Sequence, residues 1–85
     1  TVSNLGLNTN EIKDQGAQFL ADVLRNNMAL AELSIADNHI GDAGAQILRD
    51  VLRNNTTIQK LNLFQNNKIS AALRKQLEKE EKRLY

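Results

Sequence analysis

His39 is the only histidine of the chain, and two carboxylates, Asp37 and Asp42, lie within three residues of it. An imidazole beside carboxylates could bind a metal ion or transfer a proton. One histidine is a weak ligand set, however, and the matching position 28 residues earlier is Glu11. The sequence therefore predicts no metal site here.

Nucleophilic catalysis finds equally little support. Ser3, Ser34 and Ser70 have no consistent histidine and carboxylate partners for a catalytic triad. The chain also has no cysteine, which excludes a cysteine nucleophile, a thiolate zinc site and a disulfide framework. We predict a protein that is not an enzyme and uses no cofactor or metal.

The composition of the 85 residues is that of an ordinary globular chain, with 41% apolar and 25% charged side chains. Eleven basic and ten acidic residues leave a net charge of +1, which argues against a nucleic-acid partner. The sequence contains no apolar run of the roughly 20 residues that cross a bilayer, so a membrane role is not expected. The absence of cysteine fits a reducing, cytoplasmic location.

The chain repeats with a period of 28 residues. Residues 1–28 align without a gap to residues 29–56, and 14 of the 28 positions are identical. A third copy, 57–85, begins in step, gains one residue within 66–68, and then diverges into a charged segment. An atypical, polar last unit is what a capping repeat requires.

Each unit has two halves with different periodicity. Alternating apolar residues at Leu5-Gly6-Leu7, Leu33-Ser34-Ile35 and Leu61-Asn62-Leu63 predict short strands. The second halves have the apolar spacing of a helix, and Phe19 and Val23 widen the apolar face of the first. A terminal helix that Ser70 can cap is expected to cover the end of the core.

Polar residues predict where the first two helices begin and end. Asp14 and Asp42 are expected to be N-caps. The Asn pairs 26–27 and 54–55 are expected to end the helices, because Asn tolerates the left-handed conformation.

The pattern Leu-x-x-Leu-x-Leu-x-x-Asn-x-Ile, followed by Gly-Ala-x-x-Leu-x-x-x-Leu, resembles the leucine-rich repeat of the ribonuclease-inhibitor type. The two full copies of its landmarks are Val2, Leu5, Leu7, Asn10, Ile12, Gly16, Ala17, Leu20, Leu24 and Leu30, Leu33, Ile35, Asn38, Ile40, Gly44, Ala45, Leu48, Leu52. The resemblance implies one α/β domain over residues 1–85, a short right-handed solenoid or horseshoe segment. A parallel sheet would line its concave side, helices its convex side, and a C-terminal helix would cap it. It also implies a buried ladder of Asn10, Asn38 and Asn66.

Similar repeats occur in ribonuclease inhibitor, in innate-immune receptors and in tropomodulin-like actin regulators. The resemblance therefore implies a scaffold that binds a protein partner through the concave sheet. The residues expected to touch the partner are Glu32, Ser34, Asp37, Lys60, Asn62 and Phe64. Phe64 is the best aromatic candidate for a binding hot spot, and the alternative is that it packs under the C-terminal helix.

Two other roles remain open. The chain could be the structural C-terminal end of a longer repeat array that binds nothing itself, or a tropomodulin-like actin-regulatory segment. The first strand begins at once, so Val2, Leu5 and Leu7 would form an open apolar edge. We expect either an excised C-terminal piece or a chain that self-associates through this edge.

Overall fold

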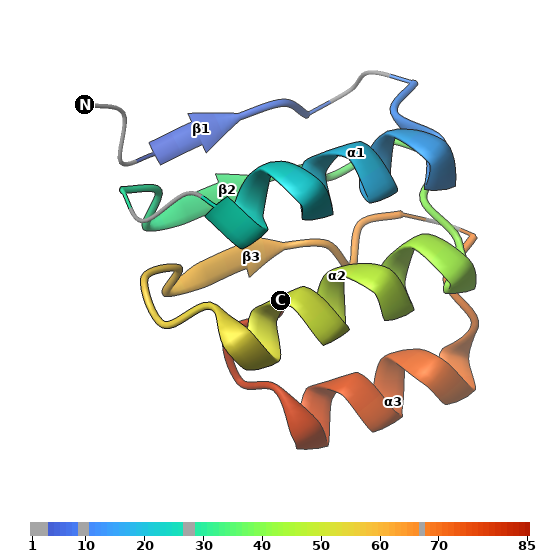
Figure 1. The fold of residues 1–85 in the computed structure, drawn as a ribbon. Helices are drawn as coiled ribbons and strands as arrows, with labels where there is room; N and C mark the ends of the chain where they lie inside the picture. The colour runs from blue at the N-terminus through green and yellow to red at the C-terminus, as the bar shows by residue number, and fades with distance from the viewer. Residues whose placement is uncertain (1–3, 9–10, 27–28, 67) are drawn as a thin grey trace.

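The computed structural model of the chain describes residues 4–8, 11–26, 29–66 and 68–85. Strands and helices alternate along the chain (Figure 1). In order they are β1 (Asn4–Gly6), α1 (Lys13–Asn26), β2 (Glu32–Ser34), α2 (Asp42–Asn54), β3 (Lys60–Asn62) and α3 (Ala71–Glu80). No helix among these residues has both the length and the apolar character needed to cross a membrane.

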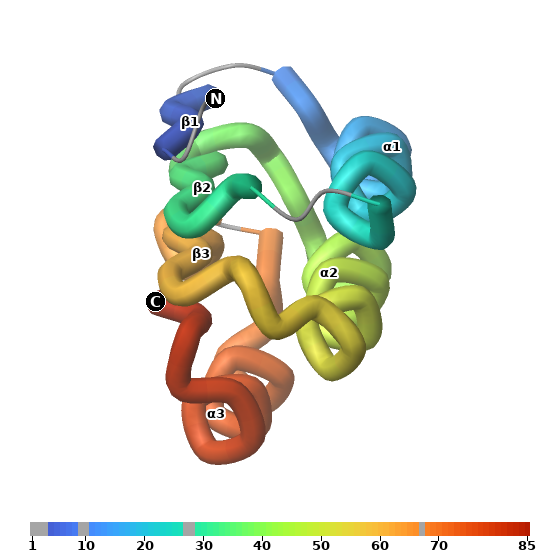
Figure 2. Tube along the Cα trace, turned by 60° about the vertical axis from the view of Figure 1, so that its left-hand side comes forward, coloured from blue at the N-terminus to red at the C-terminus, as the bar shows by residue number. Residues whose placement is uncertain are grey.

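The three strands form one parallel sheet in the order β1-β2-β3. Leu5 pairs with Leu33 and Leu33 with Leu61, so the register advances by the 28 residues of the repeat. All three helices lie on the same side of the strands (Figure 2). The expected parallel sheet with helices along one side is confirmed.

The core lies between the sheet and the helices, and the apolar columns of the second and third repeats fill it. The buried side chains of this cluster include Leu33, Ile35, Leu48, Leu52, Leu61, Leu63 and Leu77. Burying each such side chain stabilises the fold by roughly 1.5–3 kcal/mol. Most of this burial falls between repeats, so each unit depends on its neighbour.

Asn38 and Asn66 link successive repeats from inside the protein, as the resemblance implied. The Asn66 Oδ1 accepts hydrogen bonds from the backbone N–H groups of Asn38 (2.7 Å) and Ile40 (3.1 Å). Its Nδ2 donates to the carbonyls of Ile35 (3.1 Å) and Leu63 (2.6 Å). Asn10 lies outside the described residues.

Asn38 repeats this arrangement toward the first unit. Its Nδ2 donates to the Leu7 carbonyl at 2.7 Å and to the Ile35 carbonyl at 2.9 Å. Both amides are buried, and no described buried side-chain polar atom lacks a partner. The ladder thus satisfies backbone groups where each strand ends.

The expected N-cap role of Asp14 and Asp42 is wrong, because both residues lie within the first turns of their helices. Their carboxylates instead accept hydrogen bonds from the next repeat. Asp14 Oδ1 is 2.6 Å from the Gly41 nitrogen, and Asp42 Oδ1 is 2.6 Å from the Ser70 nitrogen. Gly41 and Ser70 are 29 residues apart, which fits the single extra residue predicted in the third unit.

The expected left-handed helix exit is also wrong for Asn55, which is the C-cap of α2 with φ −103° and ψ 116°. Its side chain is buried and bridges two repeats. The Nδ2 donates to the Leu24 carbonyl at 2.8 Å, and Oδ1 accepts from the nitrogens of Thr57 and Ile58, both at 2.9 Å. Asn27 lies outside the described residues.

The first repeat exposes apolar side chains that the second repeat buries. Phe19 and Val23 were expected to widen the core face of α1, but they are 66% and 44% exposed. Their matching residues in α2 lie against α1, and Val51 is buried there. A helix in this array needs a preceding helix to cover that face.

We predict that Asn66→Ala lowers the free energy of unfolding by at least about 2 kcal/mol, because buried backbone groups of two repeats lose their partners. Urea unfolding monitored by circular dichroism measures the loss. Gln65→Ala removes a neighbouring exposed amide and should change little. Equal effects of the two substitutions would contradict a structural role for the ladder.

Gly44 lies where α2 approaches Asp14 and Ala17 of α1. A Cβ at this position would lie 2.7 Å from Asp14 Oδ1 and 2.8 Å from Ile40 Cγ2. We expect Gly44→Ala to cost about 1–3 kcal/mol of stability, even though Ala favours a helix by about 1 kcal/mol. Gly6→Ala is the matched control, since its Cβ meets nothing within 4 Å. A Gly44→Ala protein as stable as wild type in urea would disprove the close approach.

Candidate functional site

The face of the sheet away from the helices carries two rows of short polar side chains. One row is Asn4, Glu32 and Lys60, and the other is Gly6, Ser34 and Asn62, as the strand register dictates. We call this surface, together with Tyr85 described below, the open face. It contains four of the six side chains predicted to contact a partner, namely Glu32, Ser34, Lys60 and Asn62.

Interactions between neighbouring strands arrange these side chains. The Lys60 ammonium lies 3.9 Å from the Glu32 carboxylate, and both groups are largely exposed. Such an exposed pair contributes little to stability, so both charges remain available to a ligand. Ser34 Oγ donates to Asn8 Oδ1 at 2.7 Å, and the same oxygen accepts from the Ala36 nitrogen at 2.8 Å.

The chain end adds a strand-like segment beside β3. Leu61 N–H donates to the Arg83 carbonyl at 2.8 Å, and Tyr85 N–H donates to the Leu61 carbonyl at 3.0 Å. Leu84, paired with Leu61, turns its side chain into the core. Because side chains alternate along a strand, Tyr85 projects onto the open face beside Asn62, and it is 54% exposed.

Arg83 holds this segment in place. Its guanidinium donates to the carbonyls of Leu52, Asn55 (2.6 Å) and Ile58 (3.1 Å), at the C-terminal end of α2. A cation is favourable at that helix end. The hydrogen bond to Leu52 takes the place in the third unit that the Asn55 bond to Leu24 takes in the second.

Glu81 completes the anchor. Its two carboxylate oxygens accept from Arg83 Nε and Nη2, each at 2.8 Å. These side-chain hydrogen bonds hold the pKa of Glu81 below its ordinary value, against the opposing effect of partial burial. The same hydrogen bonds raise the pKa of Arg83.

Tyr85 borders two hollows on this side of the molecule. One, of about 210 Å³, is lined by β1 and β2, including Gly6, Glu32 and Ser34. The other, of about 410 Å³, is lined by Gln59, Lys60, Lys82, Arg83 and Tyr85. An amphipathic aromatic between polar hollows is a common arrangement at protein interfaces.

Phe64 does not reach the open face, so the expectation of an exposed hot spot is wrong. It is only 8% exposed and belongs to the core cluster, and the Arg74 guanidinium of α3 lies 5.3 Å from its ring centroid. The alternative, packing under the C-terminal helix, is what the structure has. The physical reason is that β3 ends at Asn62, and the chain has already turned inward at Phe64, as it has at the buried Ala36.

Asp37 lies beyond β2, exposed at the carboxyl edge of the sheet rather than among the strand side chains. Its backbone and that of His39 have φ near +57° and +59°, on either side of the buried Asn38. Asp and His are among the residues that tolerate this conformation. Thr9, the corresponding residue of the first repeat, lies outside the described residues. Within the described part of the chain, no three His, Asp or Glu residues are grouped to hold a metal ion.

Tyr85 is the open-face residue that the sequence patterns missed. The repeat period places the next strand four or five residues later, whereas the third unit is shortened and reaches the sheet early. The signal was present in Leu84-Tyr85, an apolar residue followed by an aromatic after a charged helix.

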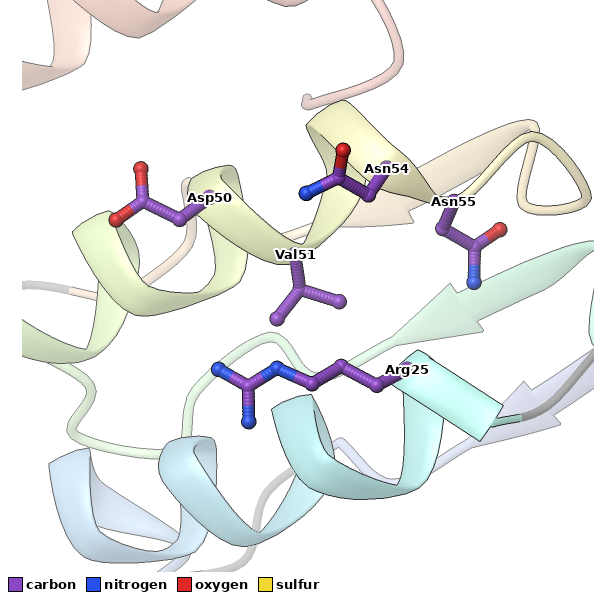
Figure 3. Close-up of a pocket in the computed structure, with 5 residues that line it drawn as sticks. All are labelled: Arg25, Asp50, Val51, Asn54 and Asn55. Carbon is purple, nitrogen blue, oxygen red and sulfur yellow. The ribbon is translucent and has the colours of Figure 1, made fainter.

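A further pocket lies on the helical side, between the C-terminal halves of α1 and α2 (Figure 3). It measures about 360 Å³ and is lined by Arg25, Asp50, Val51, Asn54 and Asn55. Arg25 pairs with Asp22, and Asp50 pairs with Arg49 and Arg53. Since its charged groups already have partners, this pocket is the weaker candidate for binding.

Comparison with known families identifies the repeats. Residues 26–48 and 54–72 match the family described as Leucine Rich repeat. The first match runs from the end of α1 through β2 into α2, and the second runs from the end of α2 through β3 into α3. Together with the parallel sheet and its three helices, the matches support a leucine-rich repeat protein. A comparison with curated proteins found no significant match.

Acid should loosen the segment that carries Tyr85. Because the pKa of Glu81 is lowered in the folded protein, its contribution is complete above its ordinary value of 4.5 and is lost as the pH falls through the lower folded value. We expect Glu81→Gln to be less stable than wild type by about 1 kcal/mol at pH 7, with the gap closing toward pH 2. Thermal unfolding as a function of pH measures the gap, and a gap that does not change with pH would contradict this role.

Proposed function

We propose that this chain is a protein-interaction module of the ribonuclease-inhibitor-like class, without catalytic activity. It would bind a protein partner through the open face. Leucine-rich repeats generally mediate protein–protein interaction, and the family is typically not enzymatic. The observation that carries the proposal is the accessible surface of Glu32, Ser34, Lys60, Asn62 and Tyr85 on a sheet whose other face is packed.

The chemistry of the open face suits a polypeptide ligand. Glu32 and Lys60 offer both signs of charge, and Ser34 and Asn62 offer small hydrogen-bonding groups close to the sheet. Tyr85 supplies apolar contact area at low cost in conformational entropy. Small side chains let a ligand approach the strands, and the exposed aromatic provides a central anchor.

A second role, the structural end of a longer array, is favoured by α3. Its outward side chains are polar or small, and only Leu73 and Leu77 are buried against the core. An outer face of this kind is typical of a capping unit. This role is compatible with binding at the open face, since the two use different surfaces.

The binding proposal predicts that Lys60→Glu combined with Tyr85→Ser loses the partner. Immobilised wild type and variant are compared by affinity capture from a lysate of the native cell, followed by mass spectrometry. We expect captured partner to fall about tenfold or more, because a hot-spot aromatic and a charge are lost together. Lys75→Glu on the exposed side of α3 is the control and should retain the partner. Equal capture by all three proteins would contradict binding through the open face.

A further inference from the structure

The exposed large apolar side chains of the described residues are not scattered. Leu5, Phe19 and Val23 all belong to the first repeat, with exposed fractions of 38%, 66% and 44%. The fourth, Tyr85, lies at the opposite end of the sheet on the open face. The apolar surface formed by Leu5, Phe19 and Val23 is called here the N-terminal edge.

The repeat shows which way the N-terminal edge faces. Val51 points from α2 toward α1 (Figure 3) and is buried there. Val23 occupies the matching place one repeat earlier, so it points away from α2, off the free side of α1. Leu5 likewise matches Leu33, which is buried under β1 and its neighbours.

The backbone of β1 has a free side facing the same direction. Leu7 N–H donates to the Ser34 carbonyl at 2.7 Å, so the polar groups of residues 5 and 7 face β2. The alternation of a strand then directs those of Asn4 and Gly6 to the outer side. Nothing lies within 4 Å of the position that a Gly6 Cβ would occupy, so the edge strand is accessible to a further strand.

We infer that the N-terminal edge binds the same edge of a second copy of this chain, about a two-fold axis perpendicular to the sheet. That axis pairs β1 with β1 as antiparallel strands and keeps both helix layers on one side. The two α1 helices then lie antiparallel, with Phe19 and Val23 between them. This arrangement covers the apolar residues of both edges at once, as an isologous contact does.

A head-to-tail arrangement of copies fits less well. The opposite end of the array is α3, whose exposed residues are charged or small, and it offers no large apolar side chain to Phe19. The N-terminal edge is complementary to itself, since it combines an apolar helix face with a free strand.

The charges near the contact do not oppose pairing. The helix positions that flank Phe19 and Val23 on the same face are Gln15, Asp22 and Asn26. Asp22, the charged one, is already paired with Arg25 of its own helix. Two copies can therefore approach without bringing uncompensated like charges together.

Sedimentation velocity and light scattering of the intact chain, from micromolar to millimolar concentration, test the inference. The wild type should shift from 9.5 kDa toward twice that mass. Phe19→Glu should remain monomeric, because a carboxylate replaces the apolar contact. Circular dichroism checks its fold, which should persist because Phe19 is exposed.

A second pair of variants tests the strand contact independently. Gly6→Pro removes an outward N–H without touching the bonds to β2 and should abolish the dimer, whereas Gly6→Ala should retain it. Tyr85→Ser removes an exposed aromatic from the open face and should also leave the dimer intact. A wild type that stays monomeric throughout overturns the inference and leaves the edge to a different partner. A dimer that survives Phe19→Glu and Gly6→Pro, or that Tyr85→Ser abolishes, overturns it equally.

Discussion

Hydrogen bonds from one repeat to the backbone of the next are the constraint on which this structure depends. The strands are three residues long, so the chain leaves the sheet almost at once, and its amides and carbonyls need partners inside the protein. Asn66 supplies these partners for the second repeat, and Asn38 reaches back to the first. Asp14 and Asn55 provide similar bonds at the two ends of α2.

This internal satisfaction of the backbone leaves the open face without a structural task. The side chains in its two rows point away from the core and make few interactions essential for packing. Glu32 and Lys60 pair only at 3.9 Å in solvent. A scaffold stabilised between its layers can therefore vary its outer residues to suit a partner, which is consistent with the proposed binding role.

The sequence predicted the repeated architecture well, because apolar periodicity and a constant 28-residue spacing are both visible in one chain. It predicted the buried amides through the family resemblance. It misassigned Asp14 because a carboxylate near a helix start reads as a cap whether its partner is local or lies in the next repeat. Phe64 was misplaced because the strand ends two residues before it, and strand ends depend on three-dimensional contacts.

Residues in the shortened third unit were the hardest to predict. Arg83 replaces an asparagine by reaching the same helix end with a longer side chain, and no periodic pattern reveals such a substitution. Tyr85 follows from it, since the position of that segment on the sheet depends on the Arg83 anchor. The N-terminal edge was visible from the sequence for Leu5 but not for Phe19 and Val23, whose exposure depends on which side of α1 a neighbour occupies.

Native-state hydrogen exchange of individual backbone amides is the most direct test of the central claim that buried asparagines hold the repeats together. The N–H groups of Asn38 and Ile40 lie outside regular strands and helices, yet both donate to Asn66 Oδ1. They should exchange only through global unfolding, as slowly as the amides of α2. Exchange of these two amides at the rate of an exposed loop would contradict the account.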